Sequence, residues 1–167
     1  MSQFSSKSRG FTLIETLVYL ALYAIIILGA LSASYSMFES SARNQTIALI
    51  EEEGSYLIGK IDWILGNSTS VISPAAQGNR LEIIDSEGDD MSVWSSVSRL
   101  KQKINNNSED ILSNSNVSVL HLTFGHAVVA SDGFSPESIA ASFTLVSTTS
   151  DGHVLSRDFS LVRYMHS

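Results

Sequence analysis

Hydrophobic positions are distributed very unevenly along the chain. No residue from Thr16 to Phe38 is charged, and nearly every position from Leu17 to Leu31 is apolar. As a helix, this uncharged segment would extend about 35 Å, enough for the roughly 30 Å hydrocarbon core of a bilayer. The pattern therefore predicts a membrane-spanning helix near the N-terminus. A buried helix in a soluble protein is the alternative, but too little ordinary sequence remains to surround one.

A second hydrophobic pattern follows the uncharged segment. Apolar residues recur there at intervals of three or four, with Gly54 filling one step: Ile47, Ile50, Leu57, Ile61 and Ile64. This spacing predicts an amphipathic helix that continues the first one and ends near Gly66-Asn67. A helix through both segments would be about 80 Å long. We expect its apolar stripe to pack on this protein's own sheet, rather than in a separate coiled coil.

Beyond residue 66 the pattern changes to short segments with β-strand character. Strands are predicted at 80–85, 117–124, 142–147 and 154–164. In the second of these, period-2 alternation predicts that Leu120, Leu122 and Phe124 share one face. In the last, Leu155, Phe159 and Leu161 are expected to face the long helix, although Arg157 falls on the same face.

Turn signals organise these strands. The segment 150–153 contains Asp-Gly between two alternating runs, which is a strong hairpin signal. Residues 97–112 are ambiguous; we interpret them as a short helix carrying Arg99, Lys101 and Lys103, interrupted by three asparagines at 105–107. The predicted fold is α+β, with a long N-terminal helix packed on a C-terminal antiparallel sheet.

Composition and charge exclude several classes of function. The chain has 167 residues, 10 Lys+Arg, 17 Asp+Glu, a formal net charge of −7 and no cysteine. Because nucleic-acid binding depends on basic side chains that neutralise phosphates, nucleic acid is not an expected partner. The absence of cysteine excludes a disulfide framework and thiolate chemistry.

No catalytic or metal-binding pattern is visible. The four histidines, His121, His126, His153 and His166, lack the helical spacing of a zinc site, and no nucleophile elbow or phosphate-binding glycine loop occurs. Asp85–Asp90 is rich in acids, but an EF-hand loop starting at Asp85 would need glutamate where Ser96 stands. We interpret it as a solvated strand connection, with a calcium-binding loop of another kind as the alternative, and predict a protein that is not an enzyme and needs no cofactor or metal.

The charges flanking the apolar segment predict its orientation. Lys7 and Arg9 precede it and Glu39 follows it, so the positive-inside rule places the N-terminus in the cytoplasm. An ordinary signal peptide, cut near Ala33, is an alternative. Against it, the uncharged run is longer than a signal-peptide core, and Glu15 stands at its entrance. An ionisable group there is costly and usually has a partner.

The segment Lys7-Ser-Arg-Gly-Phe-Thr-Leu-Ile-Glu15 resembles the processing and methylation signature of type IV prepilins and type II secretion pseudopilins. The likeness lies in a basic leader, Gly10 before the cut, Phe11 after it and Glu15 at the fifth mature position, followed by the apolar helix. It covers residues 7–38. The rest of the chain is similar to this family only in architecture.

The resemblance implies a division of the chain: a leader at 1–10, a transmembrane helix at 11–38, its amphipathic continuation at 39–66 and a β-rich domain at 67–167. It also implies that a prepilin peptidase cuts after Gly10 and methylates the new amino group of Phe11. Lys7 and Arg9 would hold the leader at the anionic cytoplasmic face. Glu15 would pair with an N-terminal amine, one helical turn away in its own chain or on a neighbouring subunit.

Two further features refine the expected role. Major type IV pilins often carry two cysteines and a proline kink in the membrane helix, whereas this chain has no cysteine and only Pro74 and Pro136. This favours a minor pseudopilin or minor pilin of the bacterial inner membrane, with an extracytoplasmic C-terminal domain, assembled into a filament with other pilin-like subunits. The alternative is an unprocessed, single-pass anchor that carries a binding domain. Type II secretion, pilus and competence systems are not distinguished by these residues.

Overall fold

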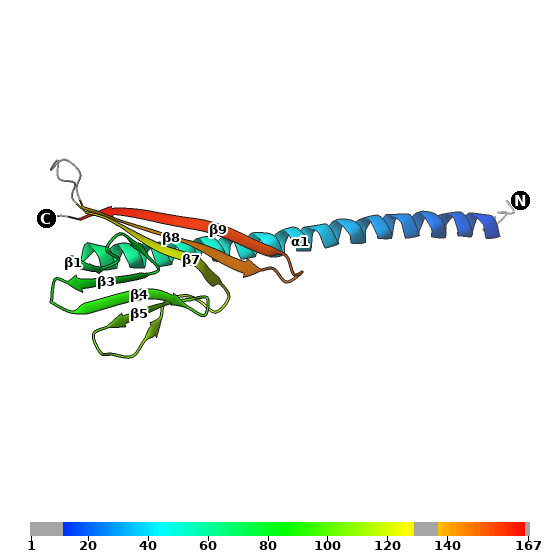
Figure 1. Ribbon diagram of the computed structural model, residues 1–167. Helices are drawn as coiled ribbons and strands as arrows, with labels where there is room; N and C mark the ends of the chain where they lie inside the picture. The colour runs from blue at the N-terminus through cyan, green and yellow to red at the C-terminus, as the bar shows by residue number, and fades with distance from the viewer. Residues whose placement is uncertain (1–11, 129–136, 166–167) are drawn as a thin grey trace, which may run out of the picture. The chain divides into compact units, whose positions relative to one another are not determined.

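The computed structural model describes residues 12–128 and 137–165. One long helix, α1, spans Leu13–Gly66, and the strands that follow it within the described residues are β1 Ser68–Ser73, β2 Gln77–Gly78, β3 Arg80–Asp85, β4 Asp90–Ser96, β5 Arg99–Ile104, β6 Asp110–Ile111, β7 Ser118–Ala127, β8 Ser138–Thr148 and β9 Val154–Tyr164 (Figure 1). The chain divides into two compact units, Met1–Ser41 and Ala42–Ser167. The second unit is called the head below.

The strands of the head form two antiparallel sheets. The five-stranded sheet has the order β1-β3-β4-β5-β6, and the four-stranded sheet has the order β2-β7-β8-β9. The predicted α+β fold, with its pilin-like helix on antiparallel β-structure, is confirmed. The two sheets meet at β7, where the Val119 N–H donates to the Ser98 carbonyl over 2.8 Å.

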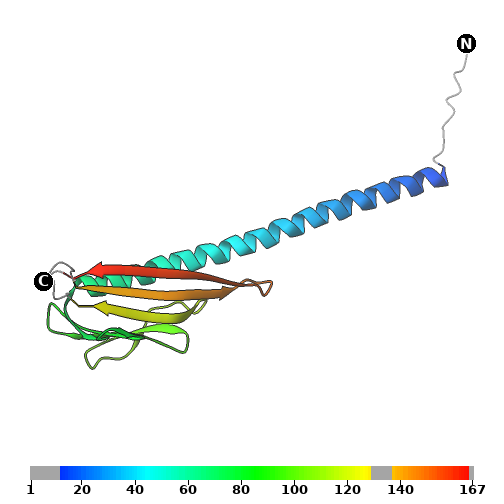
Figure 2. The same cartoon turned by 45° about the horizontal axis from the view of Figure 1, so that its top comes forward.

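The second half of α1 packs on the four-stranded sheet, as the two views agree (Figures 1 and 2). The predicted stripe is buried at Ile50, Gly54, Leu57, Ile61 and Ile64, and Ile47 is half-buried. These side chains share one core with both sheets, including Leu81, Val93, Leu100, Phe124 and Leu145. The apolar stripe therefore packs into the core of the head, as expected.

The last strand faces the helix as predicted. The Phe159 ring lies against Gly54, where an added Cβ would overlap it, and stacks on Phe143 with ring centroids 5.6 Å apart. Arg157 also faces the helix, because its Nε lies 2.9 Å from a carboxylate oxygen of Glu51. The basic residue on the inner face is thus paired with an acid on α1. The hairpin joining β8 to β9 is confirmed as well, with Gly152 at φ 87°.

Two sequence predictions are wrong. Residues 99–104 form β5 rather than a helix, and a two-residue turn with positive φ at Val97 and Ser98 joins that strand to β4. The second error concerns Leu120, which lies on the outer face. A bulge between Leu120 and Thr123, with His121 at φ 52°, shifts the alternation so that Val119 joins Leu122 and Phe124 in the core.

The acidic segment Asp85–Asp90 is a connection between β3 and β4, as interpreted from the sequence. The Asp85 carboxylate accepts hydrogen bonds from the backbone N–H groups of Glu87 (2.8 Å) and Asp89 (2.9 Å). Gly88 adopts φ 88°, which residues other than glycine rarely adopt. These features are those of a tight turn stabilised by its own first aspartate.

Candidate processing and assembly segment

The N-terminal end of α1 begins with a turn stabilised by the carbonyl group of Thr12. This carbonyl accepts from the N–H groups of Glu15 (3.0 Å) and Thr16 (3.2 Å). The Thr16 hydroxyl donates to the Leu13 carbonyl over 2.8 Å. Glu15 is the acidic residue of this first turn, where a carboxylate interacts favourably with the unpaired N–H groups of a helix N-terminus.

Glu15 has one neighbour that the sequence analysis did not single out. The Tyr19 hydroxyl donates to a Glu15 carboxylate oxygen over a long 3.5 Å. The signal was present in the spacing, because residues four apart lie on the same helix face. Tyr19 thus lies beside the carboxylate on the same face of α1, and Glu15 itself is half-buried among exposed neighbours.

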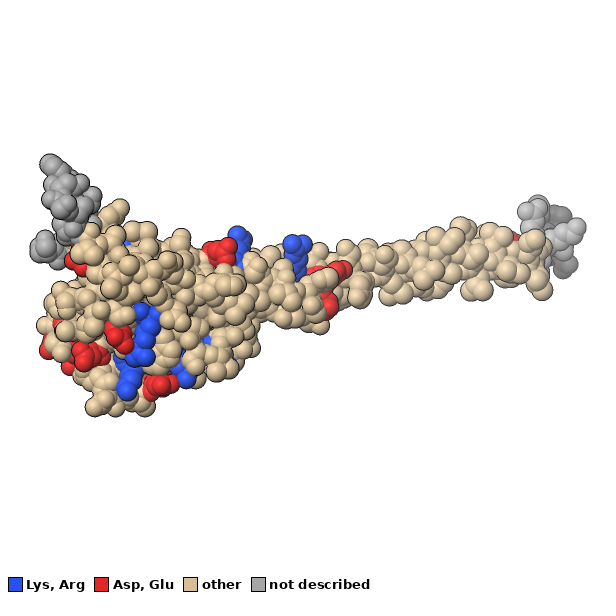
Figure 3. All heavy atoms as spheres, in the orientation of Figure 1, with Lys and Arg blue, Asp and Glu red and all other residues tan. Residues whose placement is uncertain are grey.

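The apolar side chains around and after Glu15 have no cover from the chain itself. Leu13 is 81% exposed and Leu28 is 67% exposed, and no residue of the most apolar window of the helix is buried. Figure 3 shows this end of α1 without charged side chains over most of its length. In the described part of the chain, α1 is the helix that is long and apolar enough to cross a membrane. Lipid or neighbouring apolar helices would have to cover it.

The remaining predicted site residues, Lys7, Arg9, Gly10 and Phe11, lie outside the described residues. Glu15 alone of the predicted set is placed. The cleavage, methylation and assembly roles of these residues therefore stay predictions.

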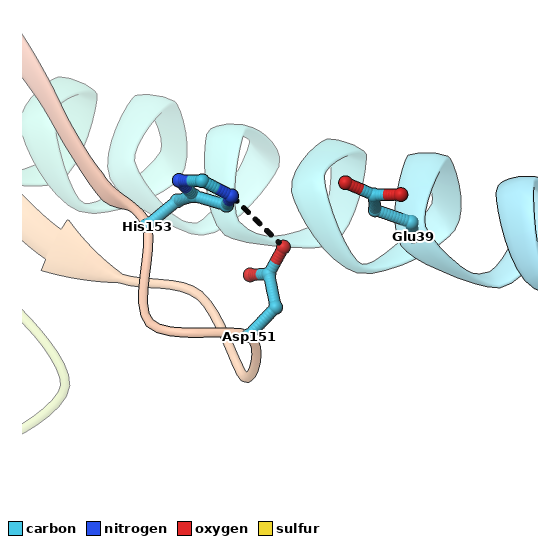
Figure 4. Close-up of side chains that lie close together, drawn as sticks. All are labelled: Glu39, Asp151 and His153. Carbon is cyan, nitrogen blue, oxygen red and sulfur yellow. Dashed lines mark ion pairs between the residues drawn. The ribbon is translucent and has the colours of Figure 1, made fainter.

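Two of the described histidines, His126 and His153, have local side-chain partners. His153 lies 3.6 Å from the Asp151 carboxylate in the β8–β9 hairpin (Figure 4), and the hydrogen bond from the Thr149 hydroxyl lowers the pKa of Asp151 below its usual value. His126 has its ring nitrogens 3.1 Å from the Pro74 carbonyl and 2.7 Å from a Glu137 carboxylate oxygen. The His126 contacts join β7 to the chain at Pro74 and Glu137, whereas the His153 contact lies within the β8–β9 connection.

Comparison with known families identifies the N-terminal segment. Residues 5–31 match the family model described as the prokaryotic N-terminal methylation motif. No curated protein and no solved structure shows significant similarity to the chain. The matched segment contains the basic leader, Gly10, Phe11 and Glu15, and runs into the exposed apolar half of α1.

The class of protein follows from the motif and the fold together. The chain is consistent with a type IV prepilin-like protein: it has the N-terminal methylation motif, a membrane-competent helix and a pilin-like α+β head. The motif implies processing by a prepilin peptidase and assembly with other pilins, and it suggests a structural subunit rather than an enzyme.

Proposed function

We propose that the chain is a minor pseudopilin or minor type IV pilin that is cut after Gly10, methylated at Phe11 and assembled into a filament for secretion, adhesion or DNA uptake. The match of residues 5–31 to the methylation motif carries the proposal. The exposure of the apolar side chains from Leu13 onward supports it, because such a helix needs lipid before assembly and neighbouring helices afterwards.

Cleavage depends on the absence of a side chain at Gly10 and on the basic leader. Lys7 and Arg9 hold the leader at the anionic cytoplasmic surface, where the peptidase acts. Cutting removes both cations and creates an α-amino group four residues before Glu15. In an apolar helix bundle this amine and the Glu15 carboxylate would each be costly alone, and pairing them removes most of that cost.

Glu15 would then set the position of each incoming subunit. A carboxylate on the insertion scale costs about 2.5–3.5 kcal/mol at the centre of a membrane helix, and less near the interface. A subunit that docks with Glu15 beside a neighbour's amine avoids leaving either charge unpaired. A subunit docked one helical turn away would leave both charges unpaired. The pair would therefore select one axial position for each subunit.

The first experiment is mass spectrometry of the mature N-terminus, in cells with and without a prepilin peptidase. We expect a chain that begins with N-methylated Phe11, and an intact chain when the peptidase is absent. Gly10→Val should block the cut, because its side chain would obstruct the protease, whereas Gly29→Val in α1 should leave it unchanged. A mature chain starting at Met1 would support an unprocessed anchor, and one starting near Ser34 would support a secreted domain.

A second experiment addresses assembly apart from processing. Glu15→Gln keeps the size of the side chain but removes its charge, and we expect normal cleavage with a strong loss of the chain from sheared filaments. Glu52→Gln, on the exposed side of α1 in the head, serves as the matched control. If both variants enter filaments as well as the parent does, the proposed role of Glu15 is wrong.

A further inference from the structure

The outward faces of the two sheets differ sharply in charge. On the five-stranded sheet, Arg80 lies 2.7 Å from Glu82, and Lys101 lies 2.9 Å from Glu109. The Arg80 guanidinium also covers the Trp94 ring, 4.9 Å from its centroid. Figure 3 shows charged side chains of both signs gathered over β3, β4 and β5. Such a face keeps its side chains in water, because docking would require breaking or burying these pairs.

The outward face of the four-stranded sheet is nearly free of charge. We call it the uncharged face and define it as the even-numbered residues of β8 and β9 with the β7 residues paired to them. It consists of Ser, Thr, Ala, Val and Gly, with Leu120 on β7 and Tyr164 on β9 as its large side chains. Asp158 is its one ionised group, and it accepts a hydrogen bond from the Thr144 hydroxyl over 2.7 Å.

Side-chain size differs between β9 and β7 in two rows of this face. Toward the C-terminal end of β9, the outward side chains are Val162 and Tyr164, which are 57% and 59% exposed. The β7 residues in the same two rows are Gly125 and Ala127, on the other side of β8. In these two rows the larger side chains therefore lie on β9 and very small ones lie on β7, whereas farther along the strands Leu120 on β7 is the larger side chain of its row. Two layers that interdigitate need this arrangement, with large residues opposite small ones.

We propose that the uncharged face packs against the same face of a second copy of this chain, about a two-fold axis that runs along β8. Such an axis places β9 of one copy over β7 of the other without changing the height of a residue along the strands. Tyr164 then lies over Ala127 of the second copy, and Val162 over its Gly125. The same contacts occur twice, as in every isologous interface.

The position of the single charge fits this symmetry. Asp158 is in the row of Leu120, next to the exposed His121 at the β7 bulge. The two-fold axis brings Asp158 of one copy over Leu120 of the other and beside its His121, on both sides of the interface. The two Asp158 carboxylates stay on opposite sides of the axis, about 10 Å apart at a strand spacing of about 4.8 Å. Each acid thus gains a histidine neighbour instead of facing its own copy.

The size and direction of the contact suit a membrane-anchored chain. Three strands of this length cover about 500 Å² per copy, or about 1,000 Å² in total, which is about the minimum for a biological interface and typical of a weak one. Anchoring both chains in one membrane raises their effective concentration and offsets a modest intrinsic affinity. Because the axis runs along the strands, the chain enters both heads from the same end. The pairing does not require cleavage after Gly10.

Crosslinking tests this directly, because the chain contains no native cysteine. Ser142 lies on β8, so two copies of Ser142→Cys would face each other across sheets about 10 Å apart, within reach of a short bismaleimide. Ser92→Cys, at the centre of the outward face of β4, is the matched control. The full chain is used in membranes, and a monofunctional maleimide confirms that both thiols react. We expect a covalent dimer with Ser142→Cys and little with Ser92→Cys.

A charge placed on the axis completes the test. Ala140→Lys, added to the Ser142→Cys chain, would oppose its own copy and should lower the yield of covalent dimer about tenfold or more. Adding Glu82→Lys on the other sheet should leave the yield unchanged. Equal crosslinking of Ser142→Cys and Ser92→Cys would overturn the proposal. So would a Ser142→Cys dimer that persists with Ala140→Lys, or a reactive Ser142→Cys thiol that gives no dimer.

Discussion

The two halves of α1 have different physical tasks, although both are rich in apolar residues. In the half before Ser41, the large apolar side chains are exposed on every side of the helix. In the half after Ala42, one stripe is buried and the other faces carry Glu, Lys and Asn. The apolar side chains of the first half must be covered by lipid or by other molecules, whereas those of the second half are covered by the sheets of the same chain. Apolar content alone does not distinguish these tasks; the arrangement of polar residues around the helix does.

The largest expected effect comes from truncating one leucine in each half. Leu57 is fully buried, so Leu57→Ala should destabilise the head by about 2–5 kcal/mol, because it removes apolar contacts and leaves a cavity. Leu28→Ala should leave head stability unchanged. Both tryptophans, Trp63 and Trp94, lie in the head, so fluorescence during urea unfolding of the full chain in mild detergent reports on the head alone. A comparable loss of unfolding free energy in both variants would contradict the different roles of the two halves of α1.

Glycines sharpen the comparison within the second half itself. A Cβ at Gly54 would overlap the Phe159 ring, whereas a Cβ at Gly59 would have no atom within 4 Å. Gly59→Ala should stabilise the head by up to about 1 kcal/mol through helix propensity. Gly54→Ala gains the same propensity, but the overlap with a packed ring should cost about 1–3 kcal/mol and reverse the sign.

The same urea titration measures both glycine variants. Opposite shifts of the unfolding midpoint are expected, down for Gly54→Ala and up for Gly59→Ala. Shifts in the same direction would show that Phe159 adjusts freely, and that the close approach of β9 to α1 is not a constraint on the fold.

The sequence predicted the parts of the fold that have strong local signals. The apolar stripe on α1, the strand at 80–85 and the Asp-Gly hairpin all agree with the structure. Gly54 interrupts the apolar stripe, and the sequence does not show why a glycine stands there. In the structure, the Phe159 ring occupies the space that a side chain at position 54 would need. Arg157 weakened the prediction for β9 for a similar reason, since its partner Glu51 lies far away in the sequence.

The errors arose where tertiary context overrides local pattern. Arg99, Lys101 and Lys103 alternate with apolar or amide residues as a strand requires, but the turn at Val97 and Ser98 has φ values that these residue types rarely adopt. The bulge at His121 also lacks a glycine, the residue type that would have indicated a positive φ in the sequence. For the candidate site, local sequence was sufficient to find Glu15, because the motif is contiguous, and a helical wheel would also have found Tyr19.

A smaller effect is expected from the ion pair that joins the second half of α1 to β9. The Arg157 and Glu51 side chains are roughly half-exposed, so a double-mutant cycle with Arg157→Gln and Glu51→Gln should give a coupling of about 0.2–1 kcal/mol. Glu52→Gln with Arg157→Gln is the matched cycle, because Glu52 is the exposed neighbour on the helix. Equal coupling energies in both cycles would show that Arg157 acts through the general negative charge of the helix and not through a specific ion pair with Glu51.

The smallest effect should come from charges on the outward face of the head, which lie in water, in contrast to Glu15 at the N-terminal end of α1. The hydrogen bond from Lys101 holds the pKa of Glu109 below its usual value, with a lesser contribution from the charge of Lys103. Lys101→Met should therefore raise the pKa of Glu109 toward its ordinary value, and Lys103→Met should raise it less. NMR titration of the Glu109 side-chain carboxyl measures both shifts.

The sign of the pH dependence follows from the lowered pKa. A carboxylate with a lower pKa in the folded state stabilises the fold at pH above its unfolded value of about 4.3, and this contribution is lost as the pH falls through the lowered pKa. The stability difference between the parent and Lys101→Met should thus be present at neutral pH and shrink in acid. Because Glu109 is exposed, the difference should also shrink as salt is added. A difference that grows in acid would mean that Lys101 stabilises the head through contacts other than Glu109.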